Sequence, residues 1–346
     1  MKALVVGGGG FVGPYLVRHL KNELGYEVTV TKTEKETLAM DGAVVKNLDI
    51  LDKNQISELL NEEKPDYLFH LAAQSSVAYS WKNPTLTVDV NIKGCVNLLE
   101  AVKDADKKPR VLLIGSGEEY GHIKKDECPI IEDNVLRPGN IYAATKSCQN
   151  MLGKIYSDAY GLDIMMVRAF NHIGPNQTPV FVVADFCKQV ADIEKGKQEP
   201  VIYVGNLSAK RDFTDVRDVV KAYALLVKGG KRGETYNVGR GHAVAIEDIL
   251  KEIVSMSDKD IEVKVDEKKL RPVDVPIIEP DIEKIKKEVG WEPVIELRQH
   301  IFGCKFFIDL QLPPCIHLLC HLSAYFDRKN NDIDKNTIYV IYTCLK

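Results

Sequence analysis

The first twenty residues constrain the fold more than any other stretch of this 346-residue chain. The apolar segment Lys2–Val6 predicts a buried strand, Gly7–Gly13 a glycine-rich turn, and Pro14–Leu20 the start of a helix. The glycines fit both G-x-x-G-x-x-G (Gly7, Gly10, Gly13) and G-x-G-x-x-G (Gly8, Gly10, Gly13). Glycine lets backbone N–H groups approach a phosphate, and a helix N-terminus adds partial positive charge. The segment therefore predicts a site for a dinucleotide pyrophosphate, with Phe11 and Val12 as further candidate contacts.

Charge and length exclude several classes of protein. The 46 basic and 50 acidic residues give a formal net charge of −4, which argues against a nucleic-acid binder with a basic face. Apolar runs such as Val180–Ala184 are far shorter than the roughly 20 residues that cross a bilayer, so we expect no membrane partner. A strand that begins at residue 2 leaves no room for a signal peptide, and we expect a cytoplasmic protein.

Strands and helices alternate along the first 170 residues. The patterns predict strands at 27–31, 44–51, 67–74, 110–115 and 163–170, and helices at 56–63, 85–103 and 142–160. This alternation is typical of an α/β fold with a Rossmann-type, doubly wound parallel sheet. Beyond it we expect helices at 181–195, 216–228, 245–256 and 281–289, and short strands near 201 and 236.

Two domains follow from this pattern. We expect an NAD(P)-binding domain over 1–170, with 216–242 returning to it. A smaller, irregular α/β substrate-binding lobe is expected over 171–215 and 243–300, followed by an atypical C-terminal tail over 301–346.

Residues that follow the predicted strands are candidate cofactor contacts. Lys32 stands where an acidic residue would accept hydrogen bonds from the ribose hydroxyls of NAD. We therefore expect NADP or NAD as the cofactor, with NADPH slightly favoured. A solvated loop lysine is the alternative interpretation. Asp49, with Ile50 beside it, is placed to meet an adenine amino group. Small residues at the end of the fourth strand allow close packing against a cofactor: Leu71, Ala72, Ala73 and Gln74.

The candidate catalytic residues lie on a helix and on a turn. Tyr142 and Lys146 are spaced i and i+4, so they share one helix face, and the ammonium is expected to lower the phenol pKa from its ordinary value near ~10. Ser116 follows an apolar strand and can donate to a carbonyl oxygen, or it can simply cap its turn. Glu118 could take a proton from a substrate carbon, or be a surface charge.

These motifs, together with Asn91, resemble the extended short-chain dehydrogenase/reductase family, which acts on nucleotide sugars. The segments Arg168–Pro175, Arg211–Asp218 and Arg271–Pro276 resemble its branch that handles GDP-mannose derivatives, and the likeness covers residues 1 to about 300. The resemblance implies reduction of the C4 ketone of GDP-4-dehydro-6-deoxy-D-mannose to GDP-D-rhamnose. Tyr142 would supply the proton and Ser116 would polarise the ketone oxygen.

The same resemblance implies further contacts and an assembly. Besides Tyr142 and Lys146, the expected cofactor contacts are Asn91, Phe170 and His172. The expected contacts to the GDP-sugar are Asn171, Lys188, Arg211, Arg271 and Asp274. A homodimer or a dimer of dimers is expected, formed through helices at 88–102 and 142–159.

Two rival functions remain open from the sequence. A GDP-mannose 4,6-dehydratase needs an extra carboxylate, and Glu118 lies where that residue sits in the dehydratases. Against it, Phe11 and Val12 stand where dehydratases have Gln and Asp, and Ser116 replaces their threonine. A non-catalytic dinucleotide sensor or scaffold is the other alternative, although such proteins usually lose the tyrosine, the lysine or the glycines.

Cysteines mark the end of the chain as unusual. Four of the eight, Cys95, Cys128, Cys148 and Cys187, show no C-x-x-C spacing and are expected as packing or surface thiols. The other four lie after residue 300, and their spacing predicts no metal site. Leu297–His300 begins a helix that we do not expect residues 301–346 to continue, and we interpret this tail as translation past a shifted reading frame.

Overall fold

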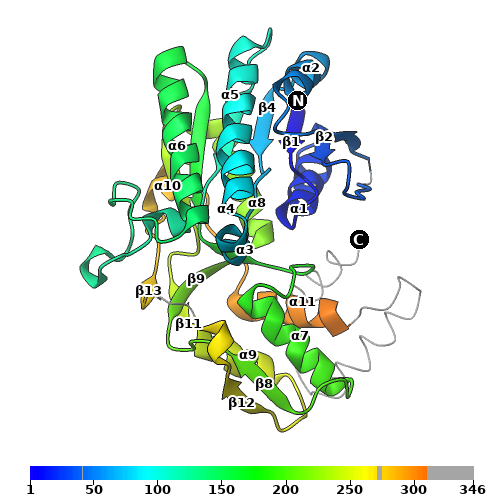
Figure 1. The fold of residues 1–346 in the computed structure, drawn as a ribbon, viewed down its shortest axis with the longest axis vertical. Coiled ribbons are helices and arrows are strands. Elements are labelled where there is room, and N and C mark those ends of the chain that lie inside the picture. The colour runs from blue at the N-terminus through cyan, green and yellow to red at the C-terminus, as the bar shows by residue number, and fades with distance from the viewer. Residues whose placement is uncertain (41, 271–274, 310–346) are drawn as a thin grey trace. The chain divides into compact units, whose positions relative to one another are not determined.

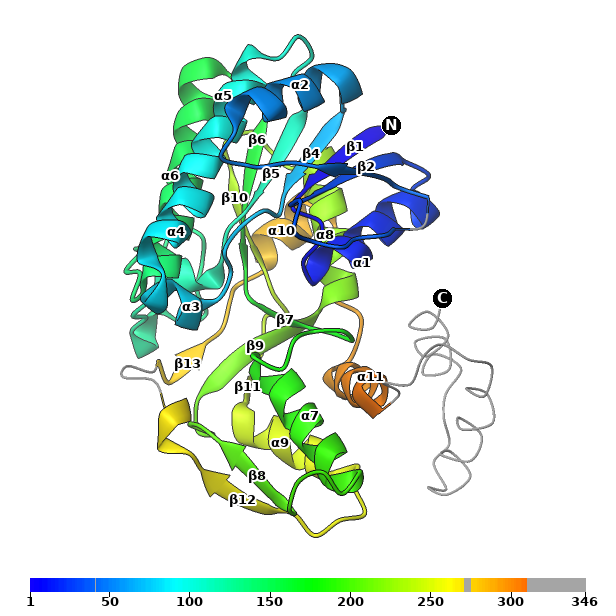
Figure 2. The ribbon, with the colours of Figure 1, turned by 45° about the vertical axis from the view of Figure 1, so that its right-hand side comes forward.

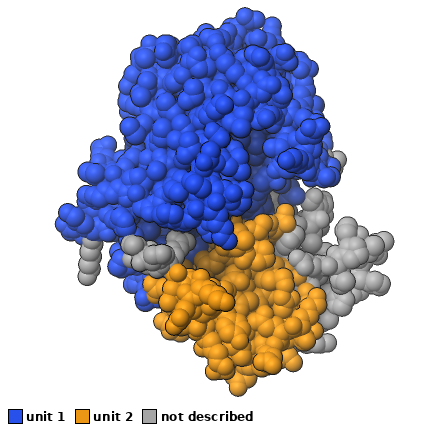
Figure 3. Space-filling model, viewed as in Figure 1, with its two compact units in different colours: residues 1–172, 208–245, 272–294 blue, residues 173–207, 246–271, 295–346 orange. Residues whose placement is uncertain are grey.

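A computed structural model describes residues 1–40, 42–270 and 275–309 of the chain. It divides into two compact units, coloured separately in Figure 3. Of the described residues, unit 1 contains 1–172, 208–245 and 275–294, and unit 2 contains 173–207, 246–270 and 295–309. Segments 208–215, 243–245 and 275–294, which we expected in the lobe, therefore cluster with unit 1.

Unit 1 is built on a seven-stranded parallel sheet (Figure 1). Its order is β10-β6-β5-β4-β1-β2-β3, so the direction of strand addition reverses between β1 and β4. The fold class predicted from the sequence is confirmed, and ligands of such sheets bind outside the carboxyl ends of the strands near this reversal. The strands are β1 (Lys2–Val6), β2 (Glu27–Lys32), β3 (Val44–Asn47), β4 (Tyr67–His70), β5 (Arg110–Ile114), β6 (Ile164–Ala169) and β10 (Thr235–Val238).

Helices cover both faces of this sheet (Figure 2). Successive side chains of a strand point to opposite faces, so Leu4 and Val6 pack in one apolar cluster while Ala3 and Val5 pack in the other. This is why the first strand is apolar throughout. One face is covered by α2 (Lys53–Glu63), α5 (Gly94–Asp104) and α6 (Ile141–Tyr160), and the other by α1 (Val12–Arg18), α8 (Val216–Gly229) and α10 (Glu283–Val289).

Several predicted elements of unit 1 differ from the structure, among them the strand predicted at 67–74, which ends at His70. The helix predicted at 85–103 is divided into α4 (Pro84–Val88), a π-helical turn η2 (Asp89–Lys93) and α5. Such turns occur often at functional sites, and η2 contains Asn91. The strand predicted at 44–51 ends at Asn47, because the Asp49 carboxylate accepts from the backbone N–H of Leu51 at 2.9 Å and turns the chain.

A second, smaller sheet surrounds β9 (Lys210–Asp215). It pairs β9 antiparallel with β11 (Ala243–Ala245) and parallel with β13 (Ile277–Ile278), and β7 (Asn171–Ile173) also pairs with β9. The short helical segments of unit 1 are η1 (His19–Glu23), α3 (Val77–Lys82), η3 (Gly117–Tyr120) and η4 (Lys125–Glu127).

Unit 2 is a small α/β unit, and its last helix runs further than predicted. It contains α7 (Val182–Glu194), β8 (Val201–Val204), α9 (Ile246–Ser255), β12 (Glu262–Val265), η5 (Glu267–Lys269) and α11 (Leu297–Asp309). We expected no helix after His300, but Ile301, Cys304 and Ile308 are buried and α11 packs on α7 and α9. Their i, i+3 and i+7 spacing puts them on one apolar face, and the packing of this face stabilises the helix beyond His300. Residues 310–346 lie outside the described residues.

Candidate active site

The glycines of the turn after β1 have two different roles, close packing of the backbone and open space for a ligand. Gly7 has φ +82°, and a Cβ on it would lie 2.4 Å from Ala72 Cα; a Cβ on Gly13 would lie 2.0 Å from Gly8 O. Both positions therefore exclude a side chain for packing reasons. Gly10 is different, because no heavy atom of the described chain lies within 4 Å of its missing Cβ. Space kept free in this way, at the N-terminus of α1, suits the close approach of a phosphate.

Backbone hydrogen bonds fix this turn against the neighbouring strands. Gly7 N donates to Thr31 Oγ1 at 3.0 Å and Gly8 N to Thr31 O at 2.9 Å. Leu71 and Ala72 both donate to the carbonyl of Val6 at 2.9 Å. The predicted contacts Gly7, Leu71, Ala72 and Ala73 therefore lie together at the carboxyl edge of β1 and β4. The flanking predicted contacts Phe11 and His172 stack with their ring centroids 6.0 Å apart, and Val12 begins α1.

Asn91 connects the end of β4 to the helix that carries the candidate catalytic residues. Its side chain is fully buried. Nδ2 donates to Thr145 Oγ1 at 2.9 Å and to Gln74 O at 3.1 Å, and Oδ1 accepts from Gln74 N at 2.8 Å. Both ends of its amide are thus bound to the protein, which fixes the end of β4 against α6; the cofactor contact that the resemblance implied stays a prediction.

Ser116 has the capping role that the sequence offered as one alternative, and its donation to a substrate carbonyl stays a prediction. It is the N-cap of η3, and its hydroxyl accepts from Glu118 N at 3.2 Å. The same side chain lies close enough to the Tyr142 phenol to oppose the rise of its pKa that burial causes. Since β5 ends at Ile114, two residues before Ser116, these two hydroxyls lie at the carboxyl edge of the sheet.

Tyr142 and Lys146 lie in the first turns of α6, where Asn140 caps the helix by accepting from Ala143 N at 2.8 Å. Burial raises the pKa of the Tyr142 phenol above its ordinary value, which corrects our expectation that Lys146 lowers it. The reason is the direction of the ammonium: Lys146 Nζ donates to Ile114 O at 2.6 Å and to Gln149 Oε1 at 3.1 Å. Burial of this ammonium lowers the Lys146 pKa to about 8.

Beneath Ser116 lies a buried ion pair that the sequence reasoning missed. Glu119 is 0% exposed, accepts from Ser116 N at 2.8 Å and pairs with Arg168 Nε at 3.1 Å. Asn150 Nδ2 donates to both of its oxygens. Burial raises the pKa of the Glu119 carboxyl, and the charge of Arg168 opposes that shift. A signal existed in the sequence, because Ser116-x-x-Glu119 is a capping-box pattern.

The other predicted contacts are spread more widely. Lys32 donates to Thr33 O at 3.2 Å, Asp49 is exposed, and Ile50 is buried against Gly94. Phe170 stacks on Tyr120, and Asn171 next to it is exposed.

Of the predicted substrate contacts considered next, Arg211 and Lys188 are bound to other groups of the protein. Arg211 donates to Val275 O at 2.7 Å. Lys188 belongs to unit 2, where it pairs with Asp192. Arg271 and Asp274 lie outside the described residues.

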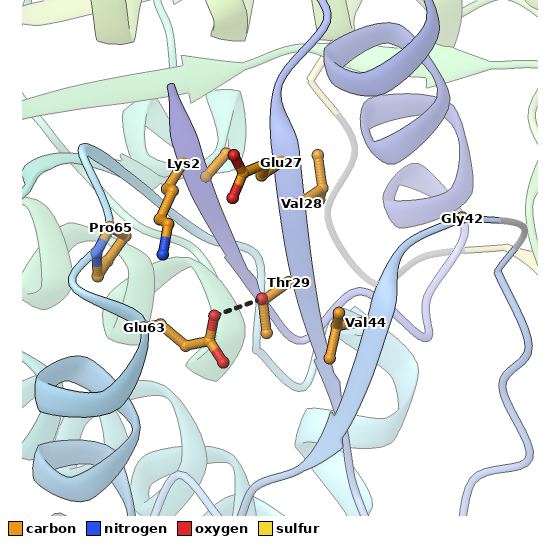
Figure 4. Close-up of a pocket in the computed structure, with 9 residues that line it drawn as sticks. Lys2, Glu27, Val28, Thr29, Gly42, Val44, Glu63 and Pro65 are labelled. Atoms are coloured by element: carbon orange, nitrogen blue, oxygen red, sulfur yellow. Dashed lines mark hydrogen bonds between the residues drawn. The ribbon is translucent and has the colours of Figure 1, made fainter.

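A separate pocket of about 230 Å³ lies at the opposite end of the sheet (Figure 4). Lys2 and Glu27 begin β1 and β2 and line it, and Thr29 donates to Glu63 there at 2.8 Å. It therefore lies at the amino ends of the strands, away from the edge where α/β sheets bind ligands. Within residues 1–40, 42–270 and 275–309, no three His, Cys, Asp or Glu side chains gather as metal ligands. None of the helices described is long and apolar enough to cross a membrane.

Comparison with known proteins places this arrangement in a family. The family model described as GDP-mannose 4,6 dehydratase matches residues 4–302. The chain belongs to this family. It is a member of the extended short-chain dehydrogenase/reductase group, as its motifs suggested.

Characterised relatives of this family member carry out several reactions. GDP-6-deoxy-D-mannose reductase of Pseudomonas aeruginosa is 30% identical over 300 residues, covering 87% of this chain and 94% of that protein. dTDP-glucose 4,6-dehydratase 1 of Escherichia coli is 31% identical over 326 residues, covering 85% of this chain and 88% of that protein. The fold also matches the P. aeruginosa reductase RMD complexed with NADPH, with a TM-score of 0.79 at 28% identity over 90% of this chain and 99% of the other.

Nucleotide-sugar epimerases share the architecture as well. UDP-glucose 4-epimerase of Thermus thermophilus in complex with NAD has a TM-score of 0.80 at 28% identity, covering 90% of this chain and all of the other. Reductases, dehydratases and epimerases thus use the same scaffold, so the reaction of this family member has to be argued from its own side chains.

Proposed function

We propose that the protein reduces the C4 ketone of GDP-4-dehydro-6-deoxy-D-mannose to GDP-D-rhamnose with a nicotinamide dinucleotide. The observation that carries the proposal is that Ser116, which follows β5, and Tyr142, in the first turn of α6, lie close enough for the Ser116 hydroxyl to influence the phenol. Similarity to the P. aeruginosa reductase over 94% of that protein's length supports the choice of substrate.

The glycine turn fits the dinucleotide. Of its five glycines, Gly10 has open space where a Cβ would stand, close to the N-terminus of α1. The N–H groups of Phe11 and Val12 begin this helix and would donate to the pyrophosphate. A nicotinamide dinucleotide bound there would supply the hydride that reduction requires.

Tyr142 is suited to giving a proton to the ketone oxygen. Its raised pKa keeps the phenol protonated at neutral pH, and an alkoxide formed at C4 is a much stronger base than a phenolate. Ser116 donates a second hydrogen bond toward developing negative charge, while its backbone is fixed by Glu119. Lys146 anchors the helix that carries Tyr142, because its Nζ donates to Ile114 O at 2.6 Å.

The dehydratase is the rival supported by a specific observation, the carboxylate of Glu118 two residues after Ser116. Its Oε2 accepts from Asn140 Nδ2 at 3.1 Å. A dehydratase first oxidises C4, which needs Tyr142 as a base and therefore a lowered pKa, and the structure gives the opposite direction.

Two incubations separate the reactions. Purified protein given the 4-keto sugar and a reduced dinucleotide should form GDP-rhamnose, identified by NMR of the product against GDP-6-deoxytalose. Protein given GDP-mannose and oxidised dinucleotide should leave the sugar unchanged. A 4-keto product in the second incubation would overturn the proposal in favour of the dehydratase.

We also propose that the expected homodimer forms through α6. Met151 and Ile155 lie one turn apart on this helix and are 60% and 53% exposed, an apolar pair that a second copy would cover. Light scattering should give twice the chain mass, and Met151→Glu should shift it toward the monomer. A monomeric wild-type protein at micromolar concentration would refute this assembly.

A further inference from the structure

A carboxylate lies beside the glycine turn although none ends β2. That strand ends at Lys32, the position whose missing acidic residue favoured NADPH in the sequence. Four residues later the chain turns back, with Glu36 N donating to Thr33 O at 3.1 Å. A Cβ on Gly9 would lie 3.1 Å from both Cδ and Oε1 of Glu36. The structure therefore supplies the acid from the loop after the strand.

This carboxylate is fixed at one oxygen. Glu36 Oε2 accepts from Thr33 N at 2.7 Å and from Thr33 Oγ1 at 3.0 Å. Both oxygens lie close to the missing Cβ of Gly9, Oε1 at 3.1 Å and Oε2 at 3.2 Å, and among the described residues no hydrogen bond to Oε1 is formed. The loop follows β2 directly, and near the end of that strand Thr31 accepts hydrogen bonds from Gly7 N and Gly8 N. The loop and the glycine turn are therefore held by the same strand. One oxygen of a positioned carboxylate thus remains available next to the turn.

Lys32, the cation that ends β2, donates to the backbone of Thr33 at 3.2 Å instead of to this carboxylate. In Rossmann folds an acidic residue at this edge accepts from the adenosine ribose hydroxyls, whereas NADP carries a phosphate on one of them. A carboxylate in contact with that phosphate would repel it.

We propose that Glu36 selects NAD(H) over NADP(H) by accepting from the ribose diol. This inference rests on the proposed function, because it assumes that the glycine turn binds a nicotinamide dinucleotide. It reverses the preference for NADPH expected from Lys32.

Calorimetric titration of the full chain with NADH and with NADPH tests the proposal without turnover. We expect NADH to bind at least about tenfold more tightly than NADPH. Glu36→Gln keeps the shape but removes the charge, and should reduce this ratio by about tenfold. Glu34→Gln, a change of the same kind on an exposed residue of the same loop, should leave the ratio as in the wild type.

The outcomes are distinguishable. Tighter binding of NADPH by the wild type, or an unchanged ratio in Glu36→Gln, would overturn the role of Glu36 while leaving the reductase intact. If neither dinucleotide binds, the cofactor site itself is refuted, and the role of Glu36 is refuted with it.

Discussion

Lys146 gives the sharpest quantitative prediction, because its ammonium is buried inside unit 1. The side chain is 2% exposed and its pKa is lowered from 10.5 to about 8. At pH 7 the lysine is charged in both the folded and the unfolded chain, so folding carries the full cost of removing this charge from water. The shift corresponds to about 3 kcal/mol at pH 7.

The sign of the pH dependence follows from the direction of the shift. As the pH rises through about 8, the folded protein loses the proton first, while the unfolded chain retains it up to the ordinary value of 10.5. The unfolded state then binds more protons, so stability rises with pH in this window. The remaining cost is about 1 kcal/mol at pH 10.

Lys146→Met removes this titration. Its lost hydrogen bonds to Ile114 O and Gln149 change stability by an amount that does not depend on pH, so only the pH-dependent part is compared. Between pH 7 and pH 10 the wild type should gain about 2 kcal/mol of unfolding free energy relative to the variant.

Urea unfolding followed by tryptophan fluorescence measures this difference. The two tryptophans, Trp81 and Trp291, both belong to unit 1 and report on the part that contains Lys146. Lys154→Met is the matched control, because its side chain on the same helix is 54% exposed and stays hydrated on folding. A difference between wild type and Lys146→Met that is the same at pH 7 and pH 10 would refute the reasoning.

Three further predictions concern the site. Tyr142→Phe should reduce kcat about 10²–10⁴-fold in steady-state assays while dinucleotide affinity stays as in the wild type; unchanged turnover would exclude this phenol as the proton donor. Gly13→Ala should cost about 1–3 kcal/mol of stability in urea titrations because its Cβ meets a backbone carbonyl. Gly10→Ala should keep the stability of the wild type and lose affinity for the dinucleotide. Equal losses of stability in the two variants would contradict the different roles of these glycines. Glu119→Ala should lower the free energy of unfolding by about 3–5 kcal/mol because it removes the carboxylate that pairs with the buried Arg168. Glu118→Ala should lower it much less. Similar thermal midpoints for the two variants would argue against the ion pair.

The sequence predicted the layers of unit 1 because apolar strands and amphipathic helices alternate there without interruption. It also predicted that Gly10, Ser116 and Tyr142 lie at one edge of the sheet, because each of them follows a strand or begins a helix at that edge. These are consequences of periodicity and connection order, which a single chain displays directly.

What the sequence could not give depends on contacts between distant residues. The acceptor of Lys146 is a carbonyl 32 residues away, and no local pattern indicates it. Glu36 reaches the glycine turn only because its loop turns back, and α11 extends to Asp309 because α7 and α9 cover its apolar face. Each of these is decided by tertiary packing that overrides the local signal.

The most direct test of the account follows hydride consumption with the keto sugar. Stopped-flow absorbance of the reduced nicotinamide, with GDP-4-dehydro-6-deoxy-D-mannose in limiting amount, should show one dinucleotide oxidised per sugar by the wild type and no burst in Tyr142→Phe. A wild-type protein that binds the reduced dinucleotide yet leaves its absorbance unchanged when this sugar is added would contradict the account.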